Sequence, residues 1–211
     1  YGFFPSAGLA WQISNEKFFE PLLKTVSKLK VRGNYGLVGN DAIGGKNERF
    51  FYLSDVNLDA NNGAYFGLNN IYNRNGVSIR NYENRNVTWE TAKIMNTAIE
   101  LTAYKGFDFI AEYWKQDRSN ILMARNIPSS MGLEAGILTN VGTVKVDGVD
   151  LTANYNHDFS NNLRVTFMSN FTYSKGVYGT YEEPTYAEPW RYRSGTMLNQ
   201  QFGLIAERLF V

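Results

Sequence analysis

The sequence predicts an all-β fold of long antiparallel strands, and three observations lead to that prediction. Apolar and polar side chains alternate through several segments, long connections alternate with short ones, and aromatic residues gather beside the short turns. A period of two places successive side chains on opposite faces of a strand. We expect about six long strands, which exceed the roughly 5–6 residues of an ordinary globular strand.

Residues 149–175 show the alternation most clearly. The odd positions carry apolar side chains, among them Leu151, Tyr155, Phe167 and Phe171. The even positions carry polar side chains, among them Asp150, Asn154, Arg164 and Asn170. The turn residues Ser160–Asn162 divide the segment into two strands of a hairpin. Such a hairpin fits either a large soluble sheet or a membrane-spanning β-barrel with a wet interior.

The other strands are expected in order along the chain, at 3–14, 29–38, 87–104 and 107–118. Residues 15–28 break the period of two and predict a short amphipathic helical turn, with Pro21 near its start. Residues 202–210 look like the beginning of a further strand. The chain starts at Tyr1 and stops at Val211 within alternating patterns, which predicts an internal piece of a longer polypeptide.

Residues 87–104 also suit a helix, because Ala, Glu, Met and Leu are good helix formers. Their Thr and Val residues favour a strand instead, as does the turn at Lys105–Gly106 that leads into the next alternating segment. In that next segment, Ile110 and Trp114 interrupt an otherwise polar face. We therefore predict two strands joined by a tight turn, the second with an imperfect pattern.

The connections are asymmetric. Long loops are expected at about 39–86, 119–140 and 177–201, and the first of these should be irregular throughout its length. Short turns join the strands at the opposite end, and aromatic residues such as Tyr104, Phe107 and Phe159 lie beside them. Outer-membrane barrels have this asymmetry, with an aromatic girdle at the membrane interface, whereas soluble sandwiches place loops at both ends. The pattern favours one barrel domain over 1–211 with its long loops extracellular.

Composition excludes several classes of function. The 211 residues include no Cys, which excludes disulfides and thiolate chemistry in this chain. The formal net charge of +1 lacks the basic excess of a nucleic-acid-binding protein. No run approaches the roughly 18–20 apolar residues of a membrane-spanning helix. His157 is the single histidine and lies beside a turn, so no nucleophile with a base and an orienting group can be assembled. We expect neither an enzyme nor a cofactor.

Two short motifs resemble ligand sites without meeting their requirements. GNDAIGGK at 39–46 has Asn40 where a phosphate-binding loop needs glycine. Asp55, Asn57 and Asp59 have the spacing of a calcium loop, but Ala60 stands where that loop has its glycine. We therefore expect a polar surface loop and no metal site in this part of the chain.

Several sequence segments, which occur in the same order along the chain, resemble those of the SusC-like branch of TonB-dependent outer-membrane transporters of Bacteroidetes. They are FPSAGLAWQISNEKFF (4–19), LKVRGNYGLVGND (29–41), VTWE (87–90), NVGTVKVDGVDLTANY (140–155) and RSGTMLNQQFGLIAERLF (193–210). The resemblance implies a barrel of about 22 strands, plugged by an N-terminal domain that this chain does not cover. It also implies TonB-energised import of an oligosaccharide or peptide, with a SusD-like surface lipoprotein as partner and TonB contacting an N-terminal region outside this chain.

The resulting site predictions fall into three groups. Side chains expected to face the lumen are Glu100, Glu112, Asp150, Asn154, Arg164 and Asn170. Leu151, Tyr155, Phe167 and Phe171 should meet outer-membrane lipid. Candidate contacts with substrate or lipoprotein are the loop aromatics Tyr52, Tyr65, Phe66, Tyr72, Tyr181, Tyr186 and Trp190, although these rings could equally serve only to pack the loops. Two alternatives to the transporter remain, a soluble or surface β-sandwich that binds glycans and a passive porin.

Overall fold

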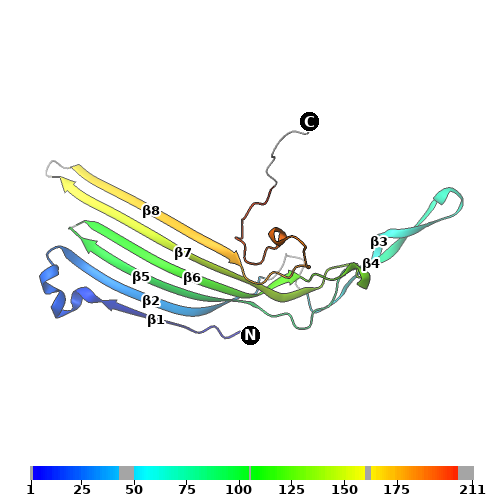
Figure 1. Cartoon of the computed structure of the whole chain (residues 1–211), viewed down its shortest axis with the longest axis horizontal. Helices are drawn as coiled ribbons and strands as arrows, with labels where there is room; N and C mark the ends of the chain where they lie inside the picture. The colour runs from blue at the N-terminus through cyan, green and yellow to red at the C-terminus, as the bar shows by residue number, and fades with distance from the viewer. Residues whose placement is uncertain (1, 43–49, 105, 160–162, 204–211) are drawn as a thin grey trace.

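The computed structural model describes residues 2–42, 50–104, 106–159 and 163–203. Six strands form one antiparallel sheet in the order β1-β2-β5-β6-β7-β8, and β3 and β4 form a separate two-stranded sheet. The strands of the large sheet are β1 (Ser6–Gln12), β2 (Val26–Asn40), β5 (Glu90–Ala103), β6 (Phe107–Ala124), β7 (Leu138–Phe159) and β8 (Leu163–Tyr178). Figure 1 shows a curved sheet that stays open, with β1 and β8 at its two edges. The predicted all-β architecture is confirmed.

Short connections lie at one end of the large sheet and long ones at the other (Figure 1). The link between β1 and β2 contains two 3-10 helices, η1 (Ile13–Asn15) and η2 (Lys17–Leu22). The helical turn predicted over 15–28 is therefore present but ends earlier, and β2 begins at Val26. The turn residues Lys105 and Ser160–Asn162, and most of the strand predicted at 202–210, lie outside the described residues.

The prediction that residues 39–86 are irregular was wrong. This segment contains a hairpin of β3 (Asp55–Phe66) and β4 (Tyr72–Asn81), joined through the short 3-10 helix η3 (Leu68–Asn70). Figure 1 shows this hairpin projecting away from the large sheet at its long-loop end. Pairing satisfies the backbone hydrogen bonds of a segment whose Asn and Gly content is unfavourable for strands.

The loop predicted at 119–140 is also shorter than expected. Strand β6 continues to Ala124 and β7 begins at Leu138, because the two ends pair with each other beyond a register shift at Arg118–Ile121. The remaining connection contains the 3-10 helix η4 (Ser129–Met131). Asn120 has a φ of 58° within this irregularity. The bulge therefore lets the paired strands extend past the point where the alternation stops.

The large sheet buries little apolar surface. Its buried apolar residues are mostly small, and Ala98 is only 1% exposed. Large apolar side chains of β8, among them Phe167 and Phe171, are 59% and 56% exposed. A soluble sandwich would cover such a face with a second sheet. Among the described residues the other sheet is the β3–β4 hairpin, which projects away from it (Figure 1).

The helices are short throughout. The last of them, η5 (Pro189–Arg191), belongs to the segment that follows β8. None of the helices in the described ranges has the length and apolar character that a membrane-spanning helix requires.

Candidate functional site

The strand register sorts side chains onto two chemically different faces. Residues that pair directly across antiparallel strands lie on the same face of the sheet. Phe107, Tyr155 and Phe167 pair in one row across β6, β7 and β8. Glu112 pairs with Asp150, which pairs with Thr172 on β8. One face of the sheet is therefore apolar and aromatic, whereas the opposite face is polar.

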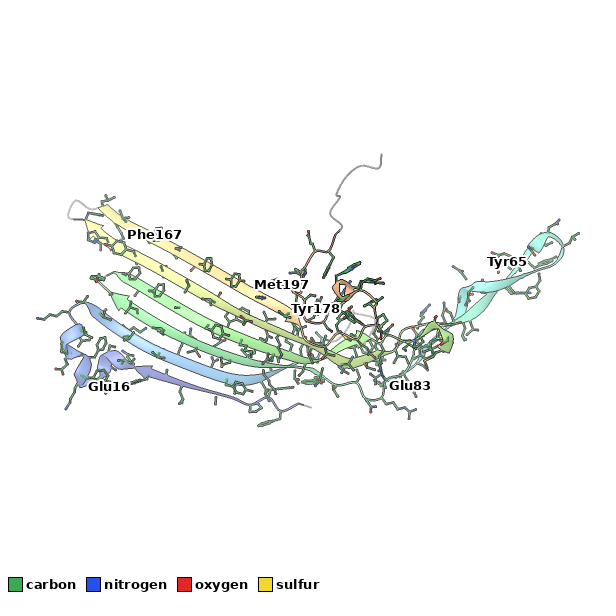
Figure 2. All side chains as sticks on the ribbon, in the orientation of Figure 1. Glu16, Tyr65, Glu83, Phe167, Tyr178 and Met197 are labelled. Atoms are coloured by element: carbon green, nitrogen blue, oxygen red, sulfur yellow. The ribbon has the colours of Figure 1, made fainter. Side chains whose placement is uncertain are left out.

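Every strand residue with a predicted facing lies on the face that its pattern indicated. The polar face contains Glu100, Glu112, Asp150, Asn154, Arg164 and Asn170. The apolar face contains Leu151, Tyr155, Phe167 and Phe171. Figure 2 shows side chains leaving both faces along the length of these strands.

Basic residues missing from the predicted set organise the polar face. Glu100 accepts hydrogen bonds from Lys28 Nζ at 3.0 Å and from Arg32 Nε at 3.1 Å. Lys30 Nζ lies 3.6 Å from the same carboxylate. The alternation Lys28, Lys30, Arg32 on one strand is a readable signal, because these positions share a face. A network of this kind holds its charged groups together on the polar face.

Trp114 interrupts the polar face, as its position predicted, and the structure shows how it is accommodated. It pairs with Gly148 on β7. A β-carbon at Gly148 would lie 2.6 Å from Trp114 Cζ2 and 2.7 Å from the carbonyl oxygen of Tyr173. The indole therefore occupies the space that a side chain on β7 would need.

The three long loops contact one another at their bases. Arg125, after β6, donates to Glu182, after β8, with Nη2 2.7 Å from Oε1 and Nε 3.0 Å from Oε2. This pairing raises the pKa of Arg125. The amide of Ile79 on β4 donates to the Glu134 carboxylate, in the loop before β7, at 2.6 Å, and the Glu134 amide donates to the Tyr82 hydroxyl at 3.3 Å. The loop between β6 and β7 therefore contacts both of the other long loops.

The segment after β8 folds back on that strand. The amide of Tyr178 donates to the carbonyl oxygen of Thr196 at 3.0 Å, and the amide of Leu198 donates to that of Gly176 at 3.0 Å. Glu183 fixes the turn between, because its carboxylate accepts the amides of Arg193 at 2.8 Å and Ser194 at 3.1 Å. This anchoring folds residues 181–202 into a compact cluster.

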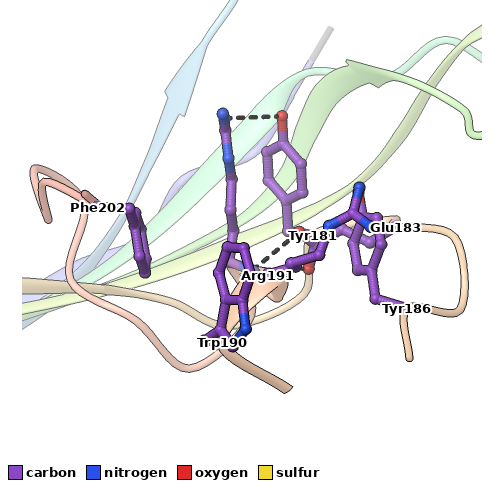
Figure 3. Close-up of a pocket in the computed structure, with 7 residues that line it drawn as sticks. Tyr181, Glu183, Tyr186, Trp190, Arg191 and Phe202 are labelled. Atoms are coloured by element: carbon purple, nitrogen blue, oxygen red, sulfur yellow. Dashed lines mark hydrogen bonds between the residues drawn. The ribbon is translucent and has the colours of Figure 1, made fainter. Parts of the chain in front are cut away.

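That cluster forms an open, shallow pocket of about 410 Å³ (Figure 3). Its lining consists of Tyr181, Glu183, Tyr186, Trp190, Arg191, Arg193 and Phe202. The Arg191 guanidinium lies over the Tyr186 ring at 4.4 Å, and that of Arg193 over the Tyr181 ring at 5.5 Å. Trp190 and Phe202 remain 63% and 51% exposed. The pocket therefore combines cationic donors with accessible aromatic surfaces.

The predicted loop aromatics fall into three separate places. Tyr181, Tyr186 and Trp190 line the pocket together. Tyr65, Phe66 and Tyr72 lie where β3 and β4 meet η3, with Phe66 paired to Tyr72. Tyr52 contacts Phe50 edge-to-face, with ring centroids 6.1 Å apart. Figure 2 shows Tyr65 on the projecting hairpin, well away from Tyr178 and Met197 beside the pocket segment.

Sequence reasoning missed the pocket residues Glu183, Arg191, Arg193 and Phe202. Arg191 and Arg193 flank Tyr192 directly after Trp190, so clustering of cations and rings was a visible signal. Glu183 carried no such signal, because its partners are backbone amides ten or more residues later.

Asp55, Asn57 and Asp59 lie in the extended strand β3 and form no loop that could wrap a cation. Within the described ranges, no group of three or more His, Cys, Asp or Glu side chains is placed to hold a metal ion.

Comparison with known proteins places this architecture in a family. A family model described as TonB dependent receptor-like, beta-barrel, matches residues 1–206. The chain belongs to the TonB-dependent receptor β-barrel family. Proteins of this family reside in the outer membrane, so these 211 residues are part of an outer-membrane protein. The β-sandwich alternative is thereby wrong.

Curated relatives extend well beyond this chain. TonB-dependent receptor P26 of Formosa agariphila is 30% identical over 155 residues, which cover 73% of this chain and 14% of that protein. TonB-dependent receptor SusC of Bacteroides thetaiotaomicron is 26% identical over 175 residues, which cover 82% of this chain and 16% of SusC. The chain thus spans only about a sixth or less of these relatives.

Solved structures share the fold. The structure of the RagAB peptide transporter superposes with a TM-score of 0.68 at 22% identity, over 91% of this chain and 20% of that chain. The open six-stranded sheet corresponds to part of the larger barrel that characterises the TonB-dependent receptor family.

Proposed function

We propose that the full-length receptor imports a bulky nutrient, an oligosaccharide or a peptide, across the outer membrane with energy delivered by TonB. The observation that carries this proposal is a sheet with one apolar and one polar face in a chain of the TonB-dependent receptor family. Relatives named SusC and the RagAB peptide transporter support a nutrient as cargo. TonB would contact a plug-bearing region outside these 211 residues.

The two faces would divide between lipid and lumen. Leu151, Tyr155, Phe167 and Phe171 would meet lipid, because their face carries apolar and aromatic side chains that no described element covers. Glu100, Glu112, Asp150, Asn154, Arg164 and Asn170 would line the lumen or contact the plug. Lipid cannot hydrogen-bond to polar groups, so the opposite arrangement would leave this charged network unsolvated.

The long loops would be extracellular, as barrels of this kind keep their short turns on the periplasmic side. The pocket formed by 177–201 together with Phe202 would contact the nutrient, because it combines accessible rings with polar groups.

The β3–β4 hairpin would contact a SusD-like lipoprotein through Tyr65, Phe66 and Tyr72. Its projection from the sheet (Figure 1) and the exposure of these three rings support that role.

Uptake measurements test the transport proposal. Cells of the native host that carry or lack the receptor gene would be given labelled oligosaccharides and peptides, with and without a protonophore. We expect receptor-dependent uptake of one nutrient that stops when the protonophore collapses the proton-motive force. Uptake that continues in the presence of the protonophore would instead indicate a passive pore.

Cysteine cross-linking tests the lipoprotein contact. Because the 211 residues of this chain include no Cys, Tyr65→Cys would introduce a unique thiol in this part of the receptor. We expect a short bifunctional reagent to link this site to a surface lipoprotein on intact cells. A matched Ser27→Cys variant at the short-turn end provides the control. Equal cross-linking from both positions, or none from Tyr65→Cys, would contradict the proposed contact.

A further inference from the structure

The pocket after β8 has more cationic than anionic hydrogen-bonding capacity. Among the residues that the structure describes, its lining includes the two guanidinium groups of Arg191 and Arg193 and a single carboxylate, that of Glu183. Both Glu183 oxygens accept backbone amides, one at 2.8 Å and the other at 3.0 and 3.1 Å. The acidic group is therefore engaged in holding the turn, and the free donors in the pocket are cationic.

The two guanidinium groups keep unused donors. Each carries five N–H groups in a planar fork that suits a carboxylate. Arg191 Nη1 forms an ion pair with the Glu188 carboxylate at 3.5 Å on an exposed surface, and Arg193 Nη1 donates to the Tyr181 hydroxyl, also at 3.5 Å. Both contacts are at the limit of hydrogen bonding. Stacking on Tyr186 and Tyr181 orients the two planes without consuming their N–H donors.

The aromatic lining favours a sugar over a peptide. Trp190 and Phe202 line the same pocket as the two arginines and expose flat apolar surfaces, and the C–H face of a pyranose ring packs well on such surfaces. Extended peptides are usually recognised through backbone hydrogen bonds along a free strand edge. Here the amides of Arg193 and Ser194 are already bound by Glu183. The pocket therefore presents a ligand mainly with side-chain groups rather than with free backbone amides.

We propose that this pocket is a binding subsite for acidic oligosaccharides whose sugar rings carry a carboxylate. Arg191 and Arg193 bind the carboxylate, and Trp190 with Phe202 packs against the apolar face of the ring. This inference rests on the proposed role in nutrient import, since it assigns a chemical class to the nutrient.

Direct binding to the purified full-length receptor in detergent tests the inference. The probes are a galacturonic acid tetramer, maltotetraose as a neutral sugar of equal length, and tetra-aspartate as an acidic peptide. We expect the galacturonate tetramer to bind at least about tenfold more tightly than either comparison, which corresponds to about 1.4 kcal/mol. Its affinity should fall as salt is raised, because the contacts with the two cations are screened.

Variants connect this binding to the pocket. Arg193→Gln and Arg191→Gln should each weaken galacturonate binding about tenfold while leaving the weak binding of maltotetraose unchanged. Trp190→Ala should weaken binding of both sugars. Arg85→Gln is the matched control, since Arg85 is an exposed arginine on a different loop whose ionic contact is Glu83. Thermal unfolding of each variant establishes that the receptor still folds.

Three results would overturn the inference: equal affinity for the galacturonate tetramer and maltotetraose, tighter binding of tetra-aspartate, or full affinity in both arginine variants. Failure of the transport proposal gives a different pattern. In that case galacturonate still binds and responds to the arginine variants, but receptor-dependent uptake into cells is absent.

Discussion

Arg32 on β2 reaches across β5 to Glu112 on β6, with its Nη2 atom 2.5 Å from the Glu112 carboxylate. The residue between them is Ala98, which pairs with both positions in the register. Its methyl group is almost fully buried beneath the ion pair. A larger side chain at this position would stand between the two charges, so the small residue allows a contact between strands that do not neighbour each other.

Glu100 and Glu112 should contribute unequally to stability. Glu100 forms ion pairs with Lys28, Lys30 and Arg32, whereas the ion pair of Glu112 with a described residue is to Arg32. Glu112→Gln should lower the free energy of unfolding by less than about 1 kcal/mol, because Arg32 keeps its contact with Glu100. Glu100→Gln should cost more, since it leaves three cations close together. Urea unfolding of the full-length receptor in lipid measures both, and equal losses would contradict this network.

The two sheet faces should tolerate charge differently. Phe171→Arg places a cation on the apolar face, farther from the short turn than the row of Phe107, Tyr155 and Phe167, and should cost roughly 2–4 kcal/mol near the bilayer midplane. Asn170→Arg, the preceding residue of the same strand but on the polar face, should cost little. Refolding yields and unfolding free energies in lipid vesicles compare the two variants. A similar response at both positions would contradict the assignment of lipid and lumen faces.

Gly148 should resist enlargement. Gly148→Ala forces a β-carbon against the Trp114 indole and the Tyr173 carbonyl oxygen, and should cost about 1–3 kcal/mol. Gly33→Ala is the matched control in the same sheet, because a β-carbon there would lie 3.8 Å from its nearest contact, the Asn96 carbonyl oxygen.

Adding Trp114→Ala to Gly148→Ala should cost less stability than the sum of the two single changes, because removing the ring makes room for the β-carbon. Unfolding in urea provides the measurement for Gly148→Ala, Trp114→Ala, the double variant and the Gly33→Ala control. If the double variant were as unstable as the sum of its single changes, the contact between the indole and Gly148 would not be the cause.

Arg125 should order the segment after β8. Arg125→Gln removes the two-pronged hydrogen bond to Glu182, while Glu183 continues to hold the turn at Arg193. We expect faster exchange of the amide hydrogens of residues 180–183 with unchanged exchange in β5 and β6. Arg74→Gln on the projecting hairpin serves as the control. Unchanged exchange at 180–183 would show that the hydrogen bonds of the Thr143 backbone and hydroxyl with Gly179 and Thr180 suffice.

The sequence alone determined the long strands of the large sheet and which side chains share a face. The reason is local, since side chains alternate along any extended chain whatever its partner. Leu151 and Asp150 therefore had to lie on opposite faces once 149–159 was extended. The position of the short turns at one end has a similarly simple reason. Each antiparallel strand reverses the direction of the chain, so every second connection lies at the same end of the sheet.

The tertiary structure decided what depended on pairing between distant segments. The β3–β4 hairpin forms although Asn-rich and Gly-rich sequence gave no alternation, and its register shifts at several positions. Strands β6 and β7 extend because their ends satisfy each other's backbone groups past a bulge. The pocket exists because Glu183 binds amides ten residues away and brings Arg193 beside Tyr181. Contacts of this kind leave no periodic pattern in the sequence, so only the folded chain reveals them.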